Sequence, residues 1–162
     1  MAKSLLSSAE KTILNSAIYE ELFASNVYKH IANQLQRLGY FGAQKFFLTE
    51  SSHELEHYQK LVDYMDERGD VATVPAISAP SVKIKSLVDA VTAAYDIEAE
   101  LGTKYEDWYK KSYNVTTQQF LLQYIEKQRV SVGEFGGLLA RLELVKDDSA
   151  GILMIDAEMG KS

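Results

Sequence analysis

The sequence predicts an all-α protein in which four long helices pack as a bundle. Four segments of about 30 residues each carry apolar side chains at helical spacing along one face. Both prolines, Pro75 and Pro80, fall in one irregular stretch near the middle of the chain. Because proline is poorly tolerated inside a helix, this stretch separates two pairs of helices. Their matched lengths favour packing side by side.

The first pair of helices is expected at residues 8–38 and 40–68. Ser7 and Glu10 have the spacing of a capping box at the start of the first helix. Gly39 is a natural stop between the two helices, because glycine readily adopts the left-handed conformation that ends a helix. The turn between them is short, so the two helices should run antiparallel.

The second pair is expected at residues 83–112 and 116–145, again joined by a short turn and therefore antiparallel. Residues 69–82 would form the connection between the pairs, with enough residues to cross the length of the bundle. A short apolar helix is expected at residues 149–159. Its residues Ile152, Leu153 and Ile155 would pack around a symmetry axis with neighbouring subunits, or else cap the bundle of their own chain.

Composition restricts the range of functions. The 162 residues fit a single domain spanning the whole chain, 1–162. The formal net charge of −6 argues against nucleic acid as a partner. The absence of cysteine excludes disulfides, zinc–thiolate sites and iron–sulfur clusters. No stretch approaches the roughly 20 apolar residues that span a bilayer, and the N-terminus lacks the apolar core of a secretory signal. We therefore expect a cytoplasmic protein without a membrane partner.

Each apolar stripe is interrupted near its middle by a residue type that binds metals. The interrupting residues are Glu21, Glu54 with His57, Glu98 and Gln128. A buried carboxylate is costly unless it is paired, hydrogen-bonded or bound to a metal. Mid-helix positions meet at one depth of a bundle whichever way the helices run. The four coinciding interruptions therefore predict a di-metal centre inside the bundle.

The ligand types indicate which metal would bind. Three carboxylates, one imidazole and one amide suit iron or manganese better than copper. Glu54 could bridge two ions, with Glu21 and His57 on the first and Glu98 on the second. Gln128 is a weak ligand, so the second ion should be held more loosely. The alternative for any single glutamate is a hydrogen-bonded or snorkelling side chain.

Three further residues are candidates for supporting roles. Tyr28, seven residues after Glu21, could hydrogen-bond a ligand or supply an electron. Glu50 and His53 form a second Glu-x-x-His motif just upstream, and would be an outer or transit metal site or a solvated pair. Trp108 and the other tyrosines on the stripes, Tyr105 among them, are expected to be packing residues, with a redox role as the alternative.

Five sequence segments resemble ferritins of the non-haem bacterial type, and the resemblance covers nearly the whole chain. The segments are Tyr19–Tyr28, Glu54–Leu61, Tyr95–Glu98, Tyr124–Gln128 and Gly151–Glu158. The resemblance implies a ferritin-like four-helix bundle with one long crossover and a short fifth helix. It also implies a shell of 24 identical subunits that acts as a ferroxidase. Such a shell oxidises Fe(II) with O2 or H2O2 and stores ferric mineral inside.

The resemblance also assigns residues by position. The first iron would be bound by Glu21, Glu54 and His57, and the second by Glu54 and Glu98, with Gln128 adjacent and Tyr28 beside the centre. Two departures from the family's sequence pattern indicate which kind of ferritin the chain resembles. Ser131 stands where a carboxylate of a third iron site is often found, which speaks against that site. Leu55 stands where bacterioferritin carries its haem-ligating methionine, so no haem is expected.

Two other functions remain open at this point. A ferritin-like di-iron peroxidase or oxidase would keep its two irons as a cofactor and build no mineral. The fourth helix lacks a second Glu-x-x-His, which argues against bacterioferritin and rubrerythrin. A DNA-protecting cage with little centre activity is disfavoured, because the chain has no basic tail.

Overall fold

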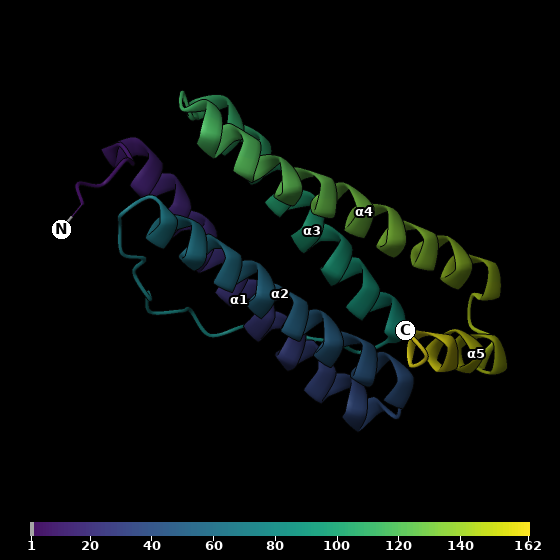
Figure 1. Cartoon of the computed structure of the whole chain (residues 1–162). Helices are drawn as coiled ribbons and strands as arrows, with labels where there is room; N and C mark the ends of the chain where they lie inside the picture. The colour runs from purple at the N-terminus through teal and green to yellow at the C-terminus, as the bar shows by residue number, and fades with distance from the viewer. Residues whose placement is uncertain (1) are drawn as a thin grey trace.

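The computed structural model describes residues 2–162, and all the regular structure in that range is helical (Figure 1). The helices are α1 (Ser8–Leu38), α2 (Phe41–Glu67), α3 (Leu87–Lys111), α4 (Val115–Val145) and α5 (Ser149–Met159). α1 packs mainly on α2, and α3 packs mainly on α4. The predicted fold class, a four-helix bundle with a long crossover and a short fifth helix, is confirmed.

The ends of α1 follow the predicted signals. The Ser7 hydroxyl accepts a hydrogen bond from the Glu10 amide at 3.2 Å, and the Glu10 carboxylate accepts one from the Ser7 amide at 2.9 Å. These two bonds form a capping box, which satisfies amides that have no partner inside the helix. Gly39 ends α1 in the left-handed conformation with a φ of 90°.

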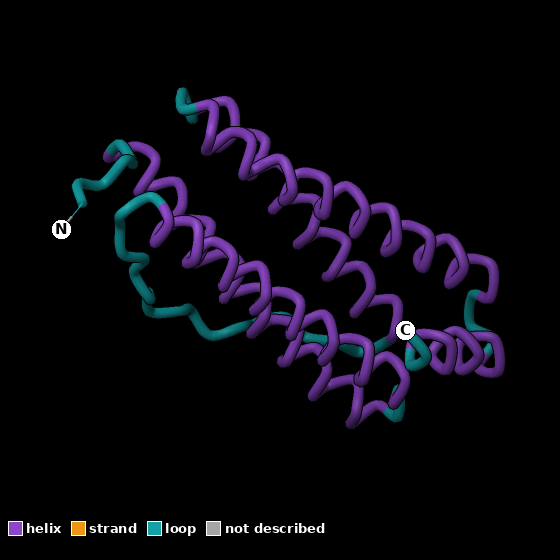
Figure 2. The backbone as a smooth tube through the Cα atoms, in the orientation of Figure 1, coloured by secondary structure: helices purple, strands orange, loops and turns teal. Residues whose placement is uncertain are grey.

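The crossover runs along the length of the bundle and is longer than predicted, because α3 begins at Leu87 and not near residue 83 (Figure 2). The Gln34 side chain of α1 holds the preceding residues in place. It donates to the Val82 carbonyl at 3.0 Å and accepts from the Ile84 amide at 2.8 Å. The Ser86 hydroxyl then caps α3 by accepting from the Asp89 amide. The Val82 carbonyl and the Ile84 amide thus bond to the Gln34 side chain, and α3 begins only after them in the sequence.

The core consists of two apolar clusters with a polar layer between them. One cluster fills the end of the bundle near α5 and includes Leu35, Phe47 and Phe135. The other fills the opposite end and includes Leu14 and Leu121. Buried polar residues from the middle of each long helix separate the two clusters. This layer is where the predicted metal ligands lie.

α5 closes one end of the bundle by packing on α2 and α4. The Asp156 carboxylate of α5 accepts from the Ala43 amide at 2.7 Å and the Gly42 amide at 3.3 Å. It thereby caps α2, whose own N-cap residue forms no side-chain cap. A Cβ at Gly42 would lie 2.0 Å from the Asp156 carbonyl oxygen, so this close approach requires glycine.

The apolar side chains of α5 divide between the chain's own core and its surface. Of the two alternatives that the sequence left open for Ile155, the intrachain one applies, because Ile155 is buried in the apolar cluster near α5. Leu153 and Met154 are exposed. Within residues 2–162, no helix is long and apolar enough to cross a membrane.

Candidate metal centre

The polar layer contains all five predicted ligands. Glu21, Glu54, His57, Glu98 and Gln128 are each between 0% and 7% exposed, although all are polar or charged. Each of the four long helices contributes at least one of them. Burying so many polar groups is costly without compensating interactions. The hydrogen bonds around each carboxylate therefore indicate which of its oxygens remain for a metal ion.

Glu21, Glu54 and His57, which we call the first subsite, lie close enough to bind one ion. One ligand atom from each residue lies within 4.8 Å of the other two. His57 Nδ1 is 3.2 Å from Glu54 Oε2 and 3.4 Å from Glu21 Oε2. Glu54 and His57 are three residues apart on α2, so both project from one face of that helix. Glu21 faces them from α1.

The pKa values of the two carboxylates of the first subsite are shifted in opposite directions. Burial, followed by repulsion from Glu21, raises the pKa of Glu54 well above its usual range. Burial also acts to raise the pKa of Glu21. Hydrogen bonds with Glu54, His57 and Tyr105 outweigh that effect and lower it. Two carboxyls that share a buried site cannot both ionise easily, and these shifts favour protonation of Glu54 over protonation of Glu21.

Glu98 and Gln128, which we call the second subsite, are arranged differently. Glu98 Oε1 accepts a hydrogen bond from the Tyr28 hydroxyl, and Oε2 accepts one from the Gln128 side-chain amide. The same amide nitrogen also lies 3.3 Å from the Glu98 backbone carbonyl. Gln128 thus presents a donor to Glu98, whereas a cation would require its carbonyl oxygen. Both Glu98 oxygens are engaged by protein groups.

Tyr28 and Tyr105 each donate to a candidate ligand from a fully buried position. Tyr28 contacts Glu98, in line with the role foreseen for it. Tyr105 donates to Glu21 Oε1, whereas the sequence indicated a packing residue or, as the alternative, a redox group. A signal for it was present, because Tyr105 follows Glu98 by the same seven residues that separate Tyr28 from Glu21.

The upstream pair, Glu50 and His53, lies at the edge of the centre. His53 Nδ1 is 3.5 Å from Glu50 Oε1, and its side chain is 48% exposed. Both residues line a polar cavity of about 300 Å³ between α2 and α4, which also reaches Glu54 and His57. Glu134 of α4 contributes to the same wall. The first subsite is therefore reached from solvent on the α2–α4 side.

Comparison with known proteins places the chain in a family. Residues 11–145 match the ferritin-like domain family. A ferritin of Pacifastacus leniusculus is 31% identical over 153 residues, which cover 90% of this chain and 84% of that protein. A probable bacterial non-heme ferritin-like protein of Haemophilus influenzae is 28% identical over 159 residues, which cover 96% of each chain.

Solved structures agree at the level of the fold. An open pore ferritin from Archaeoglobus fulgidus superposes with a TM-score of 0.94 over 97% of this chain and 98% of that chain, at 21% identity. With the family match over residues 11–145 and the relatives that span nearly the full length, this likeness leads to one conclusion. The chain belongs to the ferritin family.

Proposed function

We propose that this protein stores and detoxifies iron by oxidising Fe(II) at the buried centre and retaining the ferric product as mineral. The observation that carries the proposal is the group formed by Glu21, Glu54 and His57. It combines two carboxylates and one imidazole in a buried layer whose depth all four long helices share. Membership of the ferritin family supports the same assignment.

Iron is the substrate in this scheme, and the side chains bind and orient it. Glu21 and His57 hold the first Fe(II), Glu54 lies between the two ions, and Glu98 with Gln128 receives the second. Two Fe(II) ions give two electrons to one O2, which leaves as H2O2 after taking up two protons. With H2O2 as oxidant, the same two electrons and two protons give two waters. Carboxylates bind metals in the deprotonated form, so iron binding at Glu54 releases a proton wherever that carboxyl carries one.

The polar cavity between α2 and α4 would connect the centre to the storage space. Glu50 and His53 form an outer transit site on this path, supported by their place on the cavity wall beside Glu54. The second subsite offers one carboxylate of its own and an amide. Product would therefore leave easily and the centre would empty for the next turnover. This favours a store over a peroxidase or oxidase that keeps its irons as a cofactor.

We further propose that the protein forms a 24-subunit homo-oligomeric shell in the cytoplasm, without haem, nucleic acid or membrane partners. Leu153 and Met154 of α5 are exposed apolar side chains that need a covering surface. Leu55, at the position of a haem ligand in the related cages, supports a centre that contains iron alone.

The test is addition of Fe(II) to the metal-free protein in air while ferric absorbance is followed. Glu54→Ala removes the central ligand, and the exposed Glu67→Ala on the same helix is the matched control for loss of one carboxyl side chain. We expect fast oxidation followed by a growing, protein-bound iron load in the parent and the control, and loss of the fast phase in Glu54→Ala. Two irons per chain with no further growth would favour the retained-cofactor enzyme. Equal rates in parent and Glu54→Ala would refute the site.

A further inference from the structure

We propose that Tyr105 is a positioning residue of the metal centre, which holds Glu21 so that its Oε2 atom faces the first ion. The inference deepens the proposed function and rests on it, since it concerns how one of the proposed iron ligands is oriented. It assigns a positioning role at the centre to a residue whose pattern in the sequence indicated packing or a redox role.

The first argument is a reciprocal exchange between α1 and α3. Each helix carries a glutamate followed seven residues later by a tyrosine: Glu21 and Tyr28 on α1, Glu98 and Tyr105 on α3. Each tyrosine donates to the glutamate of the other helix. Tyr28, the later residue on α1, meets Glu98, the earlier residue on α3, and the reverse holds for Glu21 and Tyr105. The two helices therefore run antiparallel, and the two contacts are related by a local two-fold arrangement.

The second argument concerns the two oxygens of Glu21. Oε1 accepts the hydrogen bond from Tyr105. Oε2 is buried and receives no hydrogen bond from any group outside the first subsite; His57 Nδ1 lies 3.4 Å from it. A carboxylate with one oxygen fixed by a donor presents the other to an ion in a defined direction. Tyr105 therefore selects Oε2 as the metal ligand.

The third argument is that packing holds the Tyr105 side chain in one orientation. Its side chain is fully buried, and its ring stacks on Tyr124 with centroids 4.9 Å apart and meets the Trp108 ring edge-on at 5.1 Å. The hydroxyl has Glu21 Oε1 as its acceptor. The ring is held rigidly and the hydroxyl remains a donor.

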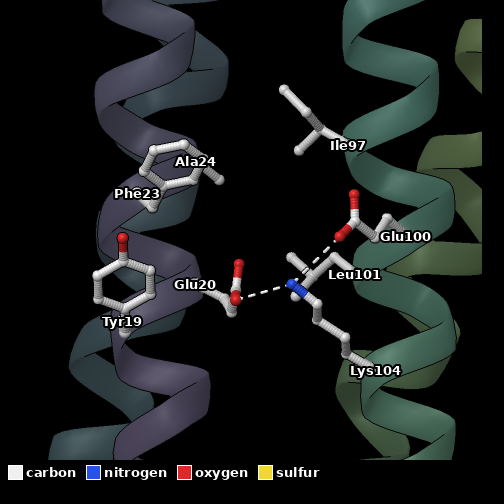
Figure 3. Close-up of a pocket in the computed structure, with 8 residues that line it drawn as sticks. All are labelled: Tyr19, Glu20, Phe23, Ala24, Ile97, Glu100, Leu101 and Lys104. Atoms are coloured by element: carbon white, nitrogen blue, oxygen red, sulfur yellow. Dashed lines mark hydrogen bonds and ion pairs between the residues drawn. The ribbon is translucent and has the colours of Figure 1, made fainter. Parts of the chain in front are cut away.

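A second contact between α1 and α3 runs beside this one on the outer surface (Figure 3). Lys104 donates to Glu20 at 2.8 Å, so the residues directly before Tyr105 and Glu21 are also paired. Lys104 also lies 3.3 Å from Glu100 of its own helix. This outer ion pair is partly exposed and would contribute little energy. It offers a control that alters the same helix pair without touching a ligand.

The experiment uses Co(II), a redox-inert probe under these conditions, added to the metal-free protein and followed by calorimetry and visible absorption. In Tyr105→Phe we expect the dissociation constant of the first ion to rise about tenfold, as for loss of other outer-shell partners, with a shifted Co(II) spectrum. The second ion should bind as in the parent. Tyr28→Phe should show the mirror pattern, in which the second ion is weakened and the first is not.

Two controls separate positioning from general loss of packing. Tyr124→Phe removes another buried tyrosine hydroxyl, one that donates to the His57 backbone carbonyl and to no ligand side chain. Lys104→Met removes the outer ion pair. Both should keep the first-ion dissociation constant within about twofold of the parent and leave the Co(II) spectrum unshifted. A spectrum and first-ion affinity unchanged in Tyr105→Phe would overturn the inference.

Failure of the proposed metal centre gives a different result, because the parent itself would then bind no pair of Co(II) ions. Failure of iron storage alone would appear in the Fe(II) test above, as two irons per chain with no further growth. If Tyr105→Phe does not fold, the role of Tyr105 can be tested by adding zinc to Tyr28→Phe and recording the tyrosine difference spectrum. In that variant Tyr105 is, within residues 2–162, the one tyrosine left that donates to the side chain of a proposed ligand. Zinc has no visible or near-ultraviolet absorption of its own. One zinc per chain should produce a near-ultraviolet tyrosine difference signal, and a flat difference spectrum would overturn the role of Tyr105.

Discussion

The two halves of the centre use similar residues but differ in readiness to bind a cation. In the first subsite, Glu21 has one oxygen held by Tyr105 and one that no outside group occupies. In the second subsite, Tyr28 and Gln128 occupy both oxygens of Glu98. Within residues 2–162, an ion that enters the first subsite displaces no hydrogen bond between Glu21 Oε2 and a group outside the subsite. The second must first lose its bond between Gln128 and Glu98.

This difference shows how a nearly symmetric bundle can produce an ordered reaction. Glu21 with Tyr28 and Glu98 with Tyr105 are related by the same spacing on α1 and α3. α2 and α4 break the symmetry. Glu54 follows Glu21 by 33 residues, whereas the residue that follows Glu98 by 33 is Ser131. We infer that the first ion binds before the second, and that the weaker half is where product leaves.

The largest effect is expected from His57→Ala, which removes the nitrogen ligand of the first subsite. The first-ion dissociation constant for Co(II) should rise by at least about 100-fold, beyond the range seen for outer-shell partners. Calorimetric titration of the metal-free protein measures it. His30→Gln, which removes an imidazole bonded to the crossover, is the control and should bind like the parent. A first ion that binds equally well without His57 would mean that the first subsite is misassigned.

Gln128→Glu should make the second subsite more like the first. A second carboxylate beside Glu98 adds charge for the cation, and we expect the second-ion dissociation constant to fall about tenfold, as ligand charge tunes other oxygen sites. The ion-free protein should become less stable, because two buried carboxyls would adjoin. Gln123→Glu, elsewhere on α4, controls for the added charge. A second ion held no more tightly in Gln128→Glu would show that Gln128 does not limit this half.

Ser25→Ala tests the packing that keeps α1 and α2 together at the first subsite. The Ser25 hydroxyl lies 2.8 Å from the Ser51 hydroxyl and 3.0 Å from the Ser51 carbonyl, all buried. Removing it leaves buried polar groups of Ser51 with fewer partners, which should cost about 1–3 kcal/mol in urea unfolding. Ser52→Ala, which removes an exposed hydroxyl of α2, should cost less than about 0.5 kcal/mol. Equal costs would remove this cross-link from the account.

The smallest effect concerns Asp70, far from the centre, and depends on pH. Hydrogen bonds with Lys11 and Ser4 lower the pKa of Asp70 to about 2 from 3.8. A lowered folded-state pKa gives stability that is present above the unfolded value and is lost as pH falls through the folded value. The parent should therefore be more stable than Asp70→Asn at pH 7. The gap should close between pH 3.8 and about 2, as measured by thermal unfolding across that range. A gap that stays constant would contradict the assignment.

The bundle and the pairing of Glu54 with His57 were predictable because their signals are local. Apolar spacing fixes which face of each helix is buried, and Glu54 and His57 lie on one face because they are three residues apart. The contact of Tyr105 with Glu21 depends on which atoms meet across α1 and α3, and periodicity does not determine this. The orientation of the Gln128 amide is likewise set by two acceptors on Glu98. The late start of α3 reflects bonds from Gln34 to residues far along the chain.

The most direct test of the ordered centre is a crystal structure of the metal-free protein soaked with one Co(II) per chain, with anomalous data at the cobalt edge. We expect a single cobalt among Glu21, Glu54 and His57, with Glu21 Oε2 as ligand and the Gln128 amide still donating to Glu98. A cobalt between Glu98 and Gln128 while the first subsite stays empty would contradict the account.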